Sequence, residues 1–395
     1  MTNVNPIIYL DHAATTPMHP QVVEKMAQVM ANTYGNASSV YSVGREAKAL
    51  LEASRESVAK SLNCLPNEVY FTGCGSEADN WAVKGYAMAN RKKGNHIITT
   101  KIEHHAILHP CEFLEKNGFE VTYLPVDETG LVSLEDVKNA IKDTTILISV
   151  MYANNEVGTI EPIAEIAKIA KEKGICMHTD AVQAVGAEAI DFKALGVDML
   201  SLSAHKFGGP KGVGALLVRK GVKLEPFMHG GAQERSRRAG TENLAGIAGL
   251  ATALEISVEN LSEKQAKIKA MRDYLISEIE ANIPHIKFNG NREHRLANNV
   301  NFCFRYIEGE SLLLMLDING ICASSGSACT SGSLDPSHVL LALGLPHEIA
   351  HGSLRLTLSS KTTREEIDYT VSKLKEIVHR LRLMSPIYDM SLEEN

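Results

Sequence analysis

The sequence has no apolar run that approaches the length of a membrane span. It also lacks a basic start followed by a long apolar core, so we expect neither a membrane-spanning helix nor a signal peptide. There is no block of like charges beyond short mixed runs, and the formal net charge is −7. Because phosphate binding along a nucleic acid needs a concentrated basic face, we expect no nucleic-acid partner.

The cysteines do not form an even, closely spaced set. Seven of them are scattered through 395 residues, which argues against a secreted disulfide framework. We therefore expect a reduced, cytoplasmic protein in which a single thiol can be reactive. The chain is longer than one core usually organises, so two domains, or one large domain with an appendage, are expected.

Apolar runs rich in strand-forming residues alternate with helical patterns in the first half of the chain. Strands are predicted at residues 68–72, 96–100, 120–124, 145–152, 175–179, 199–203 and 214–218. No repeat or low-complexity segment interrupts this series. The alternation predicts an α/β fold with a mostly parallel sheet and helices on both faces.

The character of the sequence changes after about residue 243. Long helical patterns run to about residue 282, and later segments predict strands at 299–304 and 353–359. A last helix is predicted to begin at Thr363, where two glutamates suit the helix dipole. These features predict a second, smaller α+β domain.

Polar, reactive side chains follow five of the predicted strands. They are Ser76 after the first strand, His104 after the second, Asn155 after the fourth, Asp180 with Gln183 after the fifth, and His205 with Lys206 after the sixth. In open parallel sheets, ligands bind beyond the carboxyl ends of the strands. A purely structural sheet would end in ordinary turns, so this convergence predicts a functional site.

The run GCGSEA at residues 73–78 follows a predicted strand and opens a helix, which formally matches the dinucleotide-binding fingerprint. Backbone N–H groups at a helix start, with the Ser76 hydroxyl, favour a phosphate in any case. An NAD site would use Glu103 as its acidic residue, but it would not explain Asp180 or Lys206. NAD therefore stays an alternative cofactor.

The run HEIAH at residues 347–351 matches the zinc-protease pattern. That pattern needs a helix long enough to present both histidines on one face. Here Pro346 precedes the run and Gly352 leads directly into a predicted strand, so at most one short turn fits. We interpret the match as chance and the histidines as surface or interface residues.

Lys206 lies at a predicted strand end, in the run SLSAHKFGGPKGVG at residues 201–214. Two glycines and a proline then force a turn. One interpretation is a strand followed by a basic surface loop. The other is a lysine whose amine must stay in place and react.

Pyridoxal phosphate explains these residues as one set. It needs an amine for a Schiff base, which Lys206 would supply, and an acid that keeps its ring nitrogen protonated, which suits Asp180. The flat ring of His104 can stack on the cofactor. Asn155 and Gln183 can hydrogen-bond its ring oxygen.

The second domain adds a thiol and a cation. Cys329 lies in SSGSACTSG at residues 324–332, a small, polar run that suits a nucleophile that must move, whereas Cys322 is expected to be buried. Arg355 lies in an apolar strand, where burial without an anion would be costly. A substrate carboxylate bound by both guanidinium nitrogens would meet that need.

The motifs LDHAATTP, GNASS, FTGCGSEADN, EHHA, NNEVG, HTDAVQ, SAHKFGGPKGVGAL, GGAQERSRRAGTEN, SSGSACTSG and HGSLRLTLS together resemble the NifS/IscS-type cysteine desulfurases. The resemblance covers nearly the whole chain. It implies a homodimer of the aspartate-aminotransferase fold (fold type I) that uses pyridoxal 5′-phosphate. It also implies that L-cysteine yields L-alanine and a persulfide on Cys329, which supplies iron–sulfur cluster assembly or other sulfur acceptors.

The resemblance implies a role for each matched residue. Lys206 would bind the cofactor, His104 would stack on its ring and move protons, and Cys329 would carry the persulfide. The other expected cofactor contacts are Gly75, Ser76, Asn155, Asp180, Gln183, Ser203, His205 and Thr241, the last reaching the phosphate of the other subunit. Asn155 and Arg355 are expected to hold the substrate carboxylate. No metal is expected in the desulfurase step, and contact of Cys329 with a cluster during transfer is left open.

We expect the domain boundary in the helical region near residues 251–259. Residues 14–255 would form the large cofactor-binding domain, and residues 1–13 with 256–395 a small domain carrying the cysteine loop. A NifU/IscU-like scaffold is the expected sulfur acceptor. The chain ends sooner than IscS-type members with a docking tail, so the docking mode and the NifS or IscS branch are left open. The alternatives are a selenocysteine lyase and a non-enzymatic sulfur- or metal-carrying module built on Cys322 and Cys329.

Overall fold

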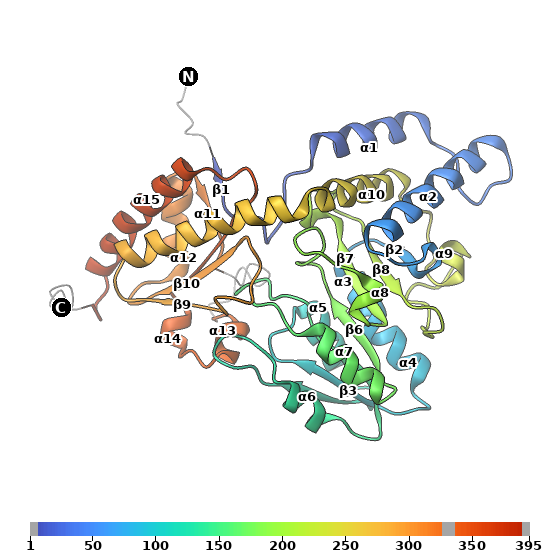
Figure 1. Cartoon of the computed structure of the whole chain (residues 1–395), viewed down its shortest axis with the longest axis horizontal. Coiled ribbons are helices and arrows are strands. Elements are labelled where there is room, and N and C mark those ends of the chain that lie inside the picture. Colours follow the sequence, from blue (N-terminus) through green and yellow to red (C-terminus); the bar gives the residue numbers. More distant parts are fainter. Residues whose placement is uncertain (1–6, 326–335, 389–395) are drawn as a thin grey trace.

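A large, mostly parallel sheet organises the chain (Figure 1). The computed structural model describes residues 7–325 and 336–388. The sheet has seven strands in the order β2-β8-β7-β6-β5-β3-β4, and β8 alone runs antiparallel to its neighbours. The strands are β2 (Val69–Thr72), β3 (His96–Thr100), β4 (Glu120–Leu124), β5 (Thr145–Ser149), β6 (Cys176–Asp180), β7 (Met199–Ser203) and β8 (Gly214–Val218). The predicted α/β fold is confirmed.

Helices cover both faces of this sheet, because successive strand residues point to opposite sides. On β7, Leu200 belongs to one apolar core and Met199 to the other. The helices over the first core are α1 (Pro20–Asn32), α2 (Ser42–Ser61), α6 (Leu134–Ala140), α7 (Ile163–Glu172), α8 (Phe192–Leu195) and α10 (Leu244–Val258). Those over the second are α3 (Gly75–Asn80), η2 (Trp81–Gly85), α4 (Tyr86–Asn90) and α5 (His105–Glu115).

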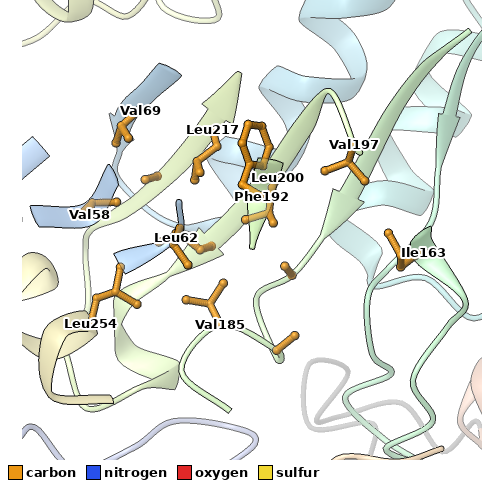
Figure 2. Packing of buried hydrophobic residues seen from close by; sticks show 14 of the residues in the cluster. Val58, Leu62, Val69, Ile163, Val185, Phe192, Val197, Leu200, Leu217 and Leu254 are labelled. Carbon is orange, nitrogen blue, oxygen red and sulfur yellow. The ribbon is translucent and has the colours of Figure 1, made fainter. Parts of the chain in front are cut away.

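Figure 2 shows part of the first core, in which Leu200, Phe192, Leu217 and Val185 belong to one apolar cluster. Leu200 and Leu217 are fully buried. Burial of a side chain of this size contributes about 1.5–3 kcal/mol. This packing holds the strand ends, and the residues that follow them, in fixed positions.

A second, smaller sheet lies on the left of Figure 1. It is antiparallel, in the order β12 (Ser353–Thr357), β10 (Asn299–Phe304) and β9 (Ile286–Phe288). Its core is shared with α11 (Leu261–Asn282), α12 (Gly309–Ile318) and α15 (Arg364–Leu383). The last helix, predicted to begin at Thr363, begins at Arg364 with Thr363 as its N-cap, and a capping box joins Thr363 and Glu366.

The N-terminal strand belongs to this second core. β1 (Ile8–Tyr9) pairs in parallel with β11 (Ile321–Cys322), and Ile8 is buried in the same apolar cluster as β10 and β12. The helical stretch after residue 243 bends by 72° between α10 and α11. The division at residues 14 and 255 stays a prediction, although each sheet has its own core.

Short elements complete the described chain. They are η1 (Pro66–Glu68), η3 (Ala204–Lys206), α9 (Gln233–Ser236), α13 (His338–Ala342) and α14 (His347–Ala350). As expected, the HEIAH run forms only one turn of helix. Within residues 7–325 and 336–388 no cluster of three His, Cys, Asp or Glu side chains could hold a metal ion.

Some predicted boundaries differ from the structure. The strand predicted at 145–152 ends at Ser149, and β6 extends to include Asp180 as its last residue. Cys322 is half-buried rather than buried, because β11 is a two-residue strand at the edge of its core. Among the helices in the described ranges, no single one is long and apolar enough to cross a membrane, and only the bent pair α10–α11 meets the length and composition test together.

Candidate active site

A cavity of about 380 Å³ lies at the carboxyl edge of the large sheet. Its walls come from the ends of β2, β3, β5, β6 and β7, and from the second sheet. The predicted residues that line it are Gly75, Ser76, His104, Asn155, Asp180, Gln183, Ser203, His205, Lys206 and Arg355. Thr241 does not line the cavity and is exposed. Cys329 lies outside the described residues, so its place stays a prediction.

Lys206 ends a short 3₁₀ turn that follows β7. Its Nζ donates hydrogen bonds to the carbonyl oxygens of Ala13, at 2.6 Å, and Ala14, at 2.9 Å. The side-chain amide of Gln183 donates to the same Ala13 oxygen at 3.0 Å. The amine is therefore held in place by the N-terminal segment, as a reactive lysine requires.

Asp180 is the last residue of β6 and is buried at the base of the cavity. Burial raises the pKa of Asp180 to about 6, although the Val182 N–H, at 2.9 Å, and the Lys206 cation both lower it. The carboxyl is therefore mostly ionised at neutral pH. An ionised carboxylate here can pair with a protonated ring nitrogen.

His104 is the N-cap of α5, and its Nδ1 accepts a hydrogen bond from the Ala106 N–H at 3.1 Å. Burial first, then the charge of Lys206 and the neighbouring histidines, lowers the pKa of His104 to about 4. The ring is therefore neutral at neutral pH, with its proton on Nε2. A neutral, flat ring on the cavity wall suits stacking on another ring.

The start of α3 forms a cradle for an anion, in which Gly75 contributes backbone but no side chain. A Cβ on Gly75 would lie 2.8 Å from Val182 Cγ2 and 3.2 Å from Ser203 Cβ, which is too close for ordinary packing. Helical backbone continues from Gly75 through Asn90, so its dipole points its positive end at the cavity. Burial, with Lys206 and Lys211, lowers the pKa of His205 to about 4. The cradle therefore combines backbone N–H groups, the Ser203 hydroxyl and a neutral histidine, and it fits a phosphate.

Arg355 reaches the cavity from β12 of the second sheet, and 2% of its side chain is exposed. Nη1 donates to the Asn155 carbonyl oxygen at 2.8 Å, and Nη2 donates to Asp11 Oδ1 at 2.9 Å. No described residue accepts a hydrogen bond from Nε. The anion predicted beside Arg355 is thus supplied in part by Asp11, and Nε can serve a ligand carboxylate.

Residues on both sides of the Cys329 segment are tied to buried groups near the cavity. The Ser353 hydroxyl donates to the Ser325 carbonyl oxygen at 2.8 Å. On the other side, Ser337 caps α13 and donates a short hydrogen bond to the buried Glu156. The chain therefore enters and leaves the segment beside the walls that carry Arg355 and Asn155.

Glu103, the acidic residue that an NAD site would use, is not available to a ligand in the cavity. Glu103 is fully buried and does not line the cavity. Its Oε1 accepts hydrogen bonds from the Thr100 hydroxyl, at 2.8 Å, and from the Met151 N–H, at 2.9 Å. Burial raises the pKa of Glu103 well above its ordinary value, so a neutral carboxyl faces the interior rather than a ribose.

Three parts of the site had no individual assignment from the sequence. The carbonyl oxygens of Ala13 and Ala14 hold Lys206, Asp11 pairs with Arg355, and Asp79 of α3 lines the cavity. Ala13, Ala14 and Asp11 lie in the run LDHAATTP. This run has no helix or strand pattern, and that absence is the only sequence signal that could have pointed to them. For Asp79 the sequence indicated only that it belongs to the helix that begins at the Gly75 cradle.

The family model of aminotransferase class V matches residues 8–370. The chain belongs to the class-V aminotransferase family. A cysteine desulfurase IscS of Clostridium botulinum is 58% identical over 388 residues, or 98% of both chains. A solved NifS-like protein has a TM-score of 0.90 at 40% identity, covering 95% of this chain and 100% of the other. A structure of SspA in complex with cysteine has a TM-score of 0.79 at 35% identity, covering 90% of this chain and 100% of that one.

These relatives confirm the resemblance inferred from the motifs. This class-V aminotransferase is a cysteine desulfurase, an enzyme that takes sulfur from L-cysteine. It shares the fold of the NifS-like proteins. The roles of its individual residues remain the predictions made from the sequence, now with their geometry.

Proposed function

We propose that the cavity binds pyridoxal 5′-phosphate on Lys206 and that Cys329 receives the sulfur of L-cysteine as a persulfide. The observation that supports this most is the shared cavity, which holds the Lys206 amine, the Asp180 carboxylate and the side-chain-free cradle at Gly75. An amine, an acid and an anion cradle are the three groups that this cofactor requires.

The charges of the described residues match the parts of the cofactor that they would contact. The phosphate would lie at Gly75, Ser76, Ser203 and His205, and the ring would lie between His104 and the base of the cavity. Asp180 would pair with the ring nitrogen, and Gln183 and Asn155 would be near the ring oxygen. Thr241 is exposed in one chain, as a residue that reaches the phosphate of a second subunit would be, so we propose a homodimer.

When bound, the cofactor supplies an electron sink for the charge left by removal of the substrate α-proton. Lys206, in its uncharged amine form, would take up this proton, and the carbonyl oxygens of Ala13 and Ala14 show how the chain holds its side chain in place. Asp180 keeps its negative charge beneath the site. His104 remains neutral and can give the proton on Nε2.

Arg355 would orient the substrate by its carboxylate, with Nε as the available donor. The SspA structure described with cysteine belongs to a protein of the same fold and supports cysteine as the substrate. The Cys329 thiolate would then attack the substrate sulfur. An S–S bond forms and the C–S bond breaks, and its electron pair stays on carbon, which is protonated to give L-alanine.

The sulfur acceptor and the location are part of the proposal. The IscS relatives support transfer of sulfur to iron–sulfur cluster assembly. We propose a NifU/IscU-like scaffold as the acceptor and a cytoplasmic location.

Three variants of the purified enzyme test the proposal. Cys329→Ser should keep the visible absorbance of the bound cofactor but lose alanine and sulfide production from L-cysteine in the presence of a thiol reductant. Lys206→Ala should lose the absorbance of the lysine-bound cofactor. Cys322→Ser is the matched control, because its half-buried thiol lies on β11, and it should keep both properties.

Full activity of Cys329→Ser on L-cysteine would contradict the thiol assignment. Wild-type protein without visible absorbance would contradict the cofactor. Parallel assays with selenocysteine separate the lyase alternative, since that reaction can proceed without the thiol.

A further inference from the structure

A second carboxyl group, that of Asp79, lies in the wall of the same cavity as Asp180. Asp79 is on α3, and 2% of its side chain is exposed. None of the residues that the structure describes donates a hydrogen bond to Asp79 Oδ1. The nearest group that could carry a positive charge is His178, whose Nε2 lies 3.8 Å from that oxygen.

His178 cannot neutralise Asp79. It is fully buried on β6, where its Nδ1 lies 2.9 Å from the Ser149 hydroxyl and its Nε2 lies 2.9 Å from the Ser201 hydroxyl. Both ring nitrogens are thus satisfied by neutral groups. Burial lowers the pKa of His178 to about 3, so the ring is uncharged at neutral pH. An ionised Asp79 would be a buried charge without a partner, which costs several kcal/mol.

The two carboxyls differ in what surrounds them. Asp180 receives the Val182 N–H and lies near the Lys206 cation, and both favour its ionised form. Burial and the charge of Asp180 raise the pKa of Asp79, and only the Ser201 hydroxyl lowers it. Two carboxyls that share a buried site give up their protons one at a time. The geometry therefore leaves the proton on Asp79.

We propose that Asp79 works as a neutral carboxylic acid, a positioning residue that keeps Asp180 as the single carboxylate facing the cavity. The part of this inference that concerns the ring nitrogen rests on the proposed function. A neutral acid offers a hydrogen-bond donor to the polar groups around it, whereas a second carboxylate would repel the first. The cavity thereby presents one negative charge at its base rather than two.

The charge state of Asp79 can be measured without any cofactor. Infrared difference spectra at neutral pH would compare cofactor-free wild type with Asp79→Asn and, as a control, Glu103→Gln, which removes a different buried carboxyl. We expect wild type minus Asp79→Asn to show the carbonyl stretch of a protonated carboxyl, at a frequency distinct from that lost in Glu103→Gln. Carboxylate stretches in that difference spectrum would overturn the inference, whatever the fate of the proposed cofactor.

The positioning role is tested in the loaded enzyme with two variants. Asp79→Asn keeps a neutral donor of the same shape, so cofactor affinity and the pH dependence of the visible band should match wild type. Asp79→Leu removes the donor, so affinity should fall about fivefold to tenfold and the band should shift. If Asp79 were ionised instead, Asp79→Asn would remove a negative charge, and its visible band would titrate at lower pH than that of wild type. If Asp79→Leu does not fold, the Asp79→Asn and infrared results still decide.

Discussion

Asp180 should make the cofactor-free enzyme less stable than an enzyme with a neutral residue there. Burial raises the pKa of Asp180 from its ordinary value of 3.8 to about 6. The unfolded chain ionises this group near pH 3.8, while the folded chain holds its proton until about pH 6. Above about pH 6 the ionised carboxyl therefore destabilises the folded state by the full amount, roughly 3 kcal/mol.

The variant Asp180→Asn removes this cost but should also remove the partner of the ring nitrogen. In denaturant unfolding of the cofactor-free proteins at pH 8, we expect Asp180→Asn to be more stable by about 3 kcal/mol, a figure that already includes the attraction between Asp180 and Lys206. Roughly half of the difference should remain at pH 5, because the unfolded chain is then ionised and the folded one is not.

A matched control should show the opposite sign. Burial raises the pKa of Asp127, but hydrogen bonds from Leu131 and Thr129 outweigh it, so the net pKa is lowered. Asp127→Asn should therefore be less stable than wild type at pH 8, with a difference that shrinks as the pH falls through that lowered pKa. Equal stability of Asp180→Asn and wild type at pH 8, or a difference that does not change between pH 8 and pH 5, would refute the reasoning.

Two further variants test the cavity walls. Gly75→Ala places a Cβ 2.8 Å from Val182 Cγ2, so it should weaken cofactor binding about tenfold in titrations of the cofactor-free protein. Adding Val182→Ala should recover part of the lost affinity. If it recovers none, the steric clash with Val182 is not the cause of the loss. Arg355→Ala leaves Asp11 without its buried partner, so it should lower the free energy of unfolding by about 3 kcal/mol and raise KM for L-cysteine more than it lowers kcat. An unchanged KM would show that Arg355 serves only the pairing with Asp11.

The sequence could predict the strand ends because the patterns that define them are local. Each parallel strand of the large sheet is a short apolar run, and the residues that follow it lie at the carboxyl edge of the sheet. His104, Asp180 and Lys206 were found in this way, and the structure brings them to one cavity. The motif GCGSEA predicted an anion cradle for the same reason, since a helix start is visible in the sequence.

The sequence could not predict contacts that depend on packing between distant segments. Asp79 looks like an ordinary polar residue in a helix, and only the way α3 lies against β6 and β7 makes it buried. Likewise, nothing local shows that Asp11 pairs with Arg355 or that alanine carbonyl oxygens hold Lys206. Strand order was also beyond reach, since β8 follows β7 but lies between it and β2.

The hydrogen bonds that join the N-terminal segment to β12 have a consequence for how the enzyme is made. Asp11 bonds Arg355, and the Ala13 N–H bonds the Thr357 hydroxyl at 2.9 Å, in each case across 344 residues of sequence. The segment that holds Lys206 is thus synthesised long before its anchor on β12. While the chain is being synthesised, the large sheet can form before this anchor exists. A ribosome-bound chain should therefore be able to form its large sheet before it can hold a cofactor firmly, and the site is completed only after β12 has been synthesised.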